Sequence, residues 1–175
     1  MDLSQFIRNV PDYPKKGIQF KDITTLLQNP VAFQFVVDQL EKRYSDQKLD
    51  VIAGIDSRGF IFGSALAYKM GISFVPIRKK GKLPAETISV EYQLEYGSDF
   101  LEIHRDSIKE NDKVLIIDDL MATGGTMGAA IHLVESLEGN IVETFCVIDL
   151  PDLGGSKKVQ TLNHKFYSMI EFSGH

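Results

Sequence analysis

The stretch Val114-Leu115-Ile116-Ile117-Asp118-Asp119-Leu120-Met121-Ala122-Thr123-Gly124-Gly125-Thr126-Met127-Gly128-Ala129-Ala130 decides the fold. Its four leading apolar residues predict a short buried strand that stops at Ile117. Two carboxylates follow, then a Thr-Gly-Gly-Thr turn and a helix-like run of small residues. Such a turn directs backbone N–H groups and a helix dipole toward an anion. The carboxylates must hold hydroxyls, a cation or both, so a ligand with a phosphate beside a sugar diol fits both halves.

Other interpretations of the turn are weaker. A nucleotide-triphosphate loop requires Lys-Ser/Thr after the second glycine of a G-x-x-x-x-G run, which is missing here. A dinucleotide site requires G-x-G-x-x-G at the turn, which is also missing. A plain strand-to-helix turn with Thr as the N-cap stays open as an alternative, although the aspartates and the two threonines disfavour it.

The composition limits the class of protein. The 175 residues are 43% hydrophobic and 25% charged, which suits one soluble globular domain. A net charge of −5 argues against a general nucleic-acid-binding surface. The single cysteine, Cys146, lies in an apolar run, which excludes an intrachain disulfide and fits a reducing compartment. With neither a membrane-length apolar run nor a signal-peptide pattern, we expect a cytoplasmic protein that binds no nucleic acid and no membrane.

Apolar periodicity alternates between strands and helices along the chain. Helices are predicted over 31–47, 60–70 and 126–137, and strands over 50–56, 72–77, 114–117, 141–150 and 165–172. The buried face of the first helix should carry Val31, Phe35, Val36, Leu40 and Tyr44. Residues 87–103 alternate as a hairpin does, with a turn signal at Gly97-Ser98-Asp99, and residues 151–156 are predicted to be loop.

This alternation predicts an α/β fold with a mostly parallel central sheet flanked by helices. We expect one domain over 1–175, with a small N-terminal hood arm (1–30), a core (31–175) and a flexible flap at about 80–103. Ligands of such sheets bind beyond the carboxyl ends of the strands. Three polar segments should therefore gather at that edge: Asp56–Arg58, the basic loop Arg78–Lys82, and Asp118–Thr126.

The chain resembles the type I phosphoribosyltransferases. Val114–Thr126 is similar to their phosphoribosyl-diphosphate motif, and further segments in the family's order resemble the branch that uses adenine: Pro11–Ile23, Gly54–Phe60, Ile77–Pro84 and Leu94–Gly97. The resemblance implies the type I phosphoribosyltransferase fold. It also implies transfer of the 5-phosphoribosyl group from phosphoribosyl diphosphate to adenine, giving AMP and pyrophosphate with Mg²⁺ as cofactor.

The resemblance also implies the site residues. Catalysis falls to Glu95, Asp118, Asp119 and Arg58, and Tyr96 supports closure of the flap. Phosphoribosyl diphosphate is expected on Ser57, Arg58, Arg78, Lys82, Asp118, Asp119, Ala122, Thr123, Gly124, Gly125 and Thr126. Adenine is expected to stack on Phe20 beside Gln19 and Lys21, where Lys21 replaces the family's frequent arginine.

Magnesium should arrive with the diphosphate and ribose, because it prefers phosphate oxygens and water to an all-protein cage. No protein metal site is therefore expected. Two alternative functions stay open: a regulator that binds phosphoribosyl diphosphate to sense nucleotides, and a transferase for a 6-oxopurine. A homodimer is expected, since a basic loop and an apolar arm are easily shared at an interface.

Overall fold

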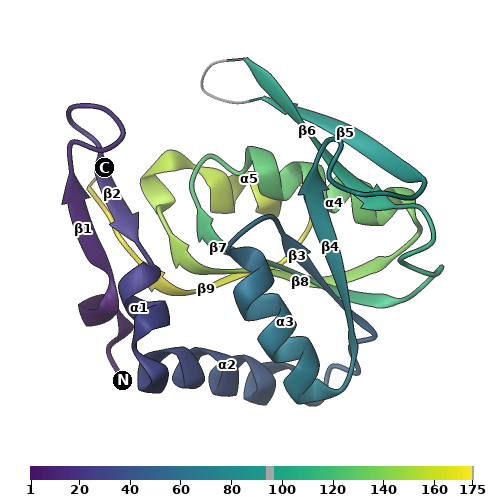
Figure 1. The fold of residues 1–175 in the computed structure, drawn as a ribbon, viewed down its shortest axis with the longest axis horizontal. Coiled ribbons are helices and arrows are strands. Elements are labelled where there is room, and N and C mark those ends of the chain that lie inside the picture. The colour runs from purple at the N-terminus through teal and green to yellow at the C-terminus, as the bar shows by residue number, and fades with distance from the viewer. Residues whose placement is uncertain (94–96, 175) are drawn as a thin grey trace.

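The fold is built on one large sheet. The computed structural model describes residues 1–93 and 97–174, in which seven strands lie in the order β5-β6-β4-β3-β7-β8-β9 (Figure 1). Five strands run parallel: β3 (Val51–Ile55), β4 (Ser73–Lys79), β7 (Lys113–Met121), β8 (Asn140–Asp149) and β9 (Phe166–Glu171). Strands β5 (Thr87–Gln93) and β6 (Ser98–His104) form an antiparallel hairpin, and β6 also pairs antiparallel with β4. The predicted mostly parallel sheet is confirmed.

Helices cover both faces of this sheet. On one face, α2 (Pro30–Tyr44) and α3 (Gly59–Met70) pack on Ile52, Leu115 and Ile117. On the other, α4 (Gly125–Ser136) and α5 (Gly155–Thr161) pack on the alternate residues Ala53, Val114 and Ile116. Since successive strand side chains point to opposite faces, a strand buried on both faces is apolar throughout, as β3 is.

Helix α2 covers most of the range predicted over 31–47, although it ends at Tyr44, and its predicted buried face is confirmed at Val36, Leu40 and Tyr44. The Asn29 side chain accepts hydrogen bonds from the N–H groups of Val31 and Ala32 (3.1 and 3.0 Å), with Pro30 in the first turn. The prediction that Val31 is buried is wrong, because it is 61% exposed. Ala32 takes the first buried position instead, in line with Val36, Leu40 and Tyr44, and Val37 lies beside them. Within the described residues, no helix is long and apolar enough to cross a bilayer.

The N-terminal arm forms a small unit of its own at one side of the molecule (Figure 1). It contains a 3₁₀ turn, η1 (Leu3–Phe6), a two-stranded sheet of β1 (Arg8–Pro11) and β2 (Gln19–Asp22), and the short helix α1 (Thr24–Gln28). Leu3, Ile23 and Leu26 are buried in the core beneath α2. The arm is therefore packed, as its apolar content predicts.

Three predicted strand boundaries are wrong, each because strand pairing continues past a polar residue. Strand β7 does not stop at Ile117 but pairs with β8 as far as Met121. Arg78 and Lys79 belong to β4 rather than to a loop, because they pair with β6. Ser98 and Asp99 lie in β6 rather than in a turn. The predicted loop over 151–156 also contains the first residues of α5, a short helix without apolar periodicity.

Candidate active site

The carboxyl ends of three neighbouring strands bring the predicted polar segments together. Arg78, at the end of β4, donates from Nε to Asp56 Oδ2, which follows β3, at 3.0 Å. Arg58, just before α3, donates from Nε to Asp119 Oδ2 of β7. The gathering predicted for these segments is therefore confirmed. Ser57 is exposed between them, and the Asp56–Ser57 peptide bond is cis.

The two aspartates of the motif lie in different surroundings. Asp119 is 6% exposed and its carboxylate is held by Arg58. Asp118 Oδ1 accepts a hydrogen bond from the Asp119 N–H at 2.8 Å and lies against the first turn of α3, at Gly59. Burial, together with the adjacent Asp119 carboxylate, raises the pKa of the Asp118 carboxyl well above its usual value. Because it is buried next to a second carboxylate, the ionised form of Asp118 destabilises the fold.

We expect Asp118→Asn to raise the melting temperature at pH 7. The unfolded chain releases this proton near its ordinary pKa of about 4, whereas the folded protein retains it to higher pH. The folded state thus binds more protons above pH 4, and the stability contributed by Asp118 falls as pH rises. Thermal unfolding between pH 5 and 8 should show that the difference in melting temperature between Asp118→Asn and the wild type becomes smaller as the pH is lowered. Asp46→Asn, which removes an exposed carboxylate, is the matched control; a lower melting temperature for Asp118→Asn at pH 7 would contradict the assignment.

Residues 122–126 form a tight loop between β7 and α4, called the phosphate loop below. It lines a hollow of about 90 Å³ together with Asp118, Leu120, Met121 and Met127. Gly124 has a φ of +76°, which favours glycine, and its carbonyl accepts from the Gly128 N–H at 2.9 Å to start the helix. The arrangement places the first N–H groups of α4 at this hollow, as an anion site requires.

Close neighbours on both sides explain the two glycines. A Cβ on Gly125 would lie 2.9 Å from the Gln93 carbonyl oxygen at the end of β5. A Cβ on Gly124 would lie 2.9 Å from the Cα of Gly155, at the start of α5. The phosphate loop is thus held between the hairpin and the α5 turn, a requirement that the motif alone did not reveal.

The hood arm contributes an aromatic hollow next to Arg58. A space of about 380 Å³ is lined by Val10, Tyr13, Phe20, Asp22, Thr24 and Arg58. Phe20 packs edge to face on Tyr13, with ring centroids 5.2 Å apart. Because Arg58 also binds Asp119, this hollow and the motif share one cation.

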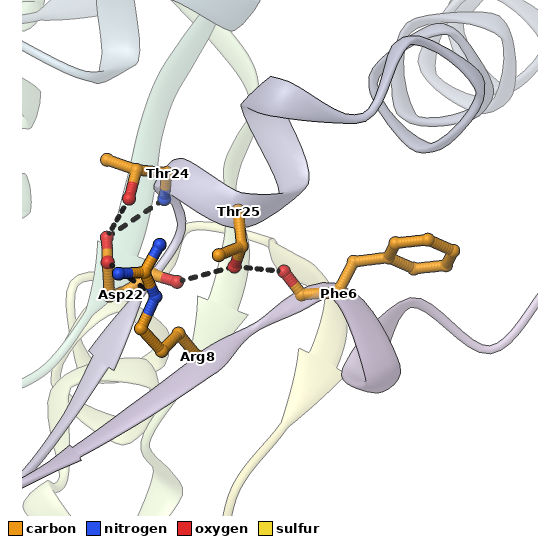
Figure 2. Close-up of polar contacts among 5 residues, drawn as sticks. All are labelled: Phe6, Arg8, Asp22, Thr24 and Thr25. Atoms are coloured by element: carbon orange, nitrogen blue, oxygen red, sulfur yellow. Dashed lines mark hydrogen bonds and ion pairs between the residues drawn. The ribbon is translucent and has the colours of Figure 1, made fainter.

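Hydrogen bonds and an ion pair hold the segments of the hood arm to one another, as Figure 2 shows. Asp22 accepts from the N–H and the hydroxyl of Thr24, at 2.9 and 2.6 Å, with the Arg8 guanidinium 3.5 Å away. Thr25 donates its hydroxyl to the Phe6 carbonyl oxygen at 2.6 Å. The bonds from Thr24, with the charges of Arg8 and Arg58, lower the pKa of the Asp22 carboxyl. The wall of the hollow is therefore fixed and anionic at this point.

Gln19 and Lys21 lie on the opposite side of β2 from Phe20. The Lys21 ammonium donates to Asn9 Oδ1 at 3.0 Å and lies over the Phe172 ring, 4.5 Å from its centroid. The Gln19 side chain accepts from Asn9 at 2.7 Å. The lining of the hollow includes neither side chain. The predicted adenine contact of Lys21 thus stays a prediction, without support from its side-chain position.

The basic turn after β4 is ordered by an acid that the sequence analysis missed. Glu102, 7% exposed on β6, accepts from the Gly81 N–H at 3.0 Å. Arg78 Nη1 donates to the Lys82 carbonyl oxygen at 3.4 Å, which joins this turn to the Asp56 ion pair. Alternation along β6 gave no signal for Glu102, because Leu101 and Ile103 on either side of it form the apolar face and an acid between them is expected to face solvent.

Glu95 and Tyr96 lie outside the described residues. Across residues 1–93 and 97–174, no group of three or more His, Cys, Asp and Glu side chains could hold a metal ion. Cys146 is buried, and burial raises the pKa of its thiol.

The fold and this combination of paired carboxylates, anion loop and flanking cations define a phosphoribosyltransferase. A family model described as the phosphoribosyl transferase domain matches residues 22–172, and the chain belongs to that family. It is 54% identical to the adenine phosphoribosyltransferase of Nitrosomonas eutropha over 98% of this chain and 99% of that one. Within the family, the chain belongs with the adenine phosphoribosyltransferases.

Solved structures agree with this placement. The adenine phosphoribosyltransferase of Thermoanaerobacter pseudethanolicus superposes with a TM-score of 0.92 at 48% identity, over 98% of both chains. The Saccharomyces cerevisiae enzyme, crystallised with an imino-altritol bisphosphate and adenine, gives a TM-score of 0.90 at 41% identity over 96% of both chains. The predicted type I phosphoribosyltransferase fold is confirmed.

Proposed function

We propose that this chain transfers the 5-phosphoribosyl group from phosphoribosyl diphosphate to adenine and releases AMP and pyrophosphate, a purine-salvage reaction. The observation that carries the proposal is the position of Arg58. It lines the aromatic hollow of the hood and also binds Asp119 of the motif. A purine in the hollow and a phosphate on the loop would therefore have the ribose between them, at the aspartates.

The motif supplies the contacts for ribose 5-phosphate. Backbone N–H groups of Ala122 to Thr126 and the hydroxyls of Thr123 and Thr126 would bind the 5′-phosphate. Asp118 and Asp119 would accept from the ribose hydroxyls. Both carboxylates also favour positive charge on the sugar ring, which develops as the diphosphate departs. Asp119 is already held by Arg58, so its orientation costs little when substrate binds.

The diphosphate would lie at the basic edge. Arg58, Arg78 and Lys82 are the cations proposed to stabilise it as a leaving group, with contacts from Ser57. We propose Mg²⁺ as the cofactor, held by the diphosphate and ribose hydroxyls, because the described residues supply paired carboxylates rather than a cage of ligands. When bound, Mg²⁺ would neutralise the charge that builds on the departing pyrophosphate.

Adenine would stack on Phe20, whose ring faces the hollow with Tyr13. We assign reading of the base edge to the backbone around Gln19, since carbonyl and N–H groups complement the adenine amino group and ring nitrogens. Glu95 is proposed as the general acid/base near the imidazole ring of the purine, and Tyr96 as a support for closure. We further propose that the chain works as one domain, with residues 1–30 as hood and about 80–103 as a flexible flap.

We also propose that the enzyme is a cytoplasmic homodimer. Two exposed apolar side chains on one side of α3, Ile61 and Tyr68, support an interface there, since Tyr68 is 91% exposed. The buried, solitary Cys146 suits a reducing compartment. Light scattering should give twice the mass of the chain at micromolar concentration. A single-chain mass would contradict the dimer.

The experiment for the function is a stoichiometric assay. Purified protein with adenine, phosphoribosyl diphosphate and Mg²⁺ should produce AMP and pyrophosphate in equal amounts, followed by phosphorus NMR. Omission of Mg²⁺ should abolish turnover. Binding of phosphoribosyl diphosphate without any product would instead identify a nucleotide-sensing regulator.

A further inference from the structure

A turn outside the motif lies in backbone contact with the phosphate loop. Gly154 and Gly155 join the 3₁₀ turn η2 (Pro151–Leu153) to α5. The Gly155 N–H donates to the Ala122 carbonyl oxygen at 3.0 Å. A Cβ on Gly155 would press on that oxygen and lie 2.8 Å from the Gly124 nitrogen and 2.8 Å from Met121 Sδ. The backbones of the two segments thus touch with no room for a side chain.

This hydrogen bond fixes the direction of a peptide plane. In a trans peptide unit, the carbonyl oxygen of one residue and the N–H of the next point to opposite sides. Because the Ala122 carbonyl points at Gly155, the Thr123 N–H points away from α5. A carbonyl turned toward the hollow would repel an anion, so this orientation is the one that an anion site requires.

The turn is bonded to the motif at two points and closed by its own hydrogen bonds, so it can hold the loop. The Leu150 N–H donates at 3.0 Å to the carbonyl oxygen of Met121, the residue directly before the phosphate loop. The Gly154 N–H donates to Pro151 at 3.1 Å, and the Gly154 carbonyl accepts from Lys158 at 3.0 Å. Gly154 has a φ of +79°, and a Cβ there would meet no atom within 4 Å.

We propose that Gly155 is a positioning residue for the 5′-phosphate, acting through the Ala122–Thr123 peptide. The inference rests on the proposed function of the phosphate loop. It assigns no ligand contact to α5. Its distinctive consequence is selectivity: ligands that carry a 5′-phosphate depend on Gly155, whereas pyrophosphate, bound at the basic edge, does not.

The test compares Gly155→Ala with Gly128→Ala. Gly128 lies one turn into α4, where a Cβ meets only side chains at 4.0 Å, so alanine there should leave binding unchanged. Calorimetry should show that Gly155→Ala lowers the affinity of the protein for AMP and for ribose 5-phosphate by about tenfold. A loss of this size is expected for a misaligned hydrogen bond to a charged group. Magnesium pyrophosphate should bind as in the wild type. In turnover, the KM for phosphoribosyl diphosphate should rise more than kcat falls.

Two results would overturn the inference in a folded Gly155→Ala variant: AMP and ribose 5-phosphate affinities equal to those of the wild type, or an equal loss for pyrophosphate. If Gly155→Ala fails to fold, Gly154→Ala strains the same turn without a clash and should give the same selective loss, with the same overturning results. A wild type that binds ribose 5-phosphate but transfers nothing to adenine would refute the proposed function and leave this inference standing.

Discussion

Asp119→Asn should lower kcat/KM for phosphoribosyl diphosphate by roughly a hundredfold to a thousandfold, the usual effect of removing one preorganised electrostatic group. The carboxylate is buried beside Arg58, in a place where positive charge on the ribose ring would develop. An amide keeps the size of the side chain but not its charge. Steady-state kinetics with saturating adenine would measure the loss.

The same substitution should cost little stability, which separates a ligand-facing role from a structural one. The Arg58 side chain is 47% exposed, so its guanidinium can turn to water once Asp119 is neutral. Loss of the repulsion on Asp118 offsets part of the lost ion pair. Asp38→Asn, at the ion pair with Lys69 on α2 and α3, is the matched control and should leave kinetics unchanged. An Asp119→Asn protein that unfolds would identify Asp119 as a structural residue.

Phe20→Ala should reduce kcat/KM for adenine by about tenfold to a hundredfold, because stacking of a base on an aromatic ring contributes roughly 1–3 kcal/mol. Phe20 lines the hollow beside Tyr13, and its loss leaves one ring there. The KM for phosphoribosyl diphosphate should change much less, since the phosphate loop lies elsewhere. Initial rates with each substrate varied in turn would measure the two effects.

Phe20→Leu is the control, since it keeps apolar volume but removes the ring. If stacking carries the affinity, leucine should recover only part of the loss. Full recovery by leucine would show that filled volume is sufficient. An equal rise in both KM values for Phe20→Ala would show that the hood supports the whole site rather than the base.

Local patterns predicted the features that lie within one segment. The strand-acid-glycine-helix order predicted the phosphate loop. The rule that ligands bind at the carboxyl ends of parallel strands predicted that the segments of Arg58 and Asp119 gather at one edge, where the two side chains form an ion pair. The N-cap of α2 followed from Asn29 and Pro30. In each case the decisive atoms are within a few residues, or the sheet topology brings them together.

Features set by distant packing could not be predicted in this way. Whether Val31 or Ala32 begins the buried face of α2 depends on what packs against its first turn, because both residues are apolar. Adjacent strand residues point to opposite faces, so Phe20 and Lys21 cannot both line the hollow, and which of them does so depends on how the hood packs on the core. Gly155 has the sequence surroundings of an ordinary loop glycine, and only its close contacts with Met121, Ala122 and Gly124 show why a side chain is excluded.

The central claim is that the hood selects adenine while the motif holds the sugar. A competition assay tests it most directly: equimolar adenine, hypoxanthine, guanine and xanthine, with limiting phosphoribosyl diphosphate and Mg²⁺, and separation of the nucleotide products by chromatography. We predict that AMP is nearly the sole product. Predominance of IMP, GMP or XMP would contradict the account.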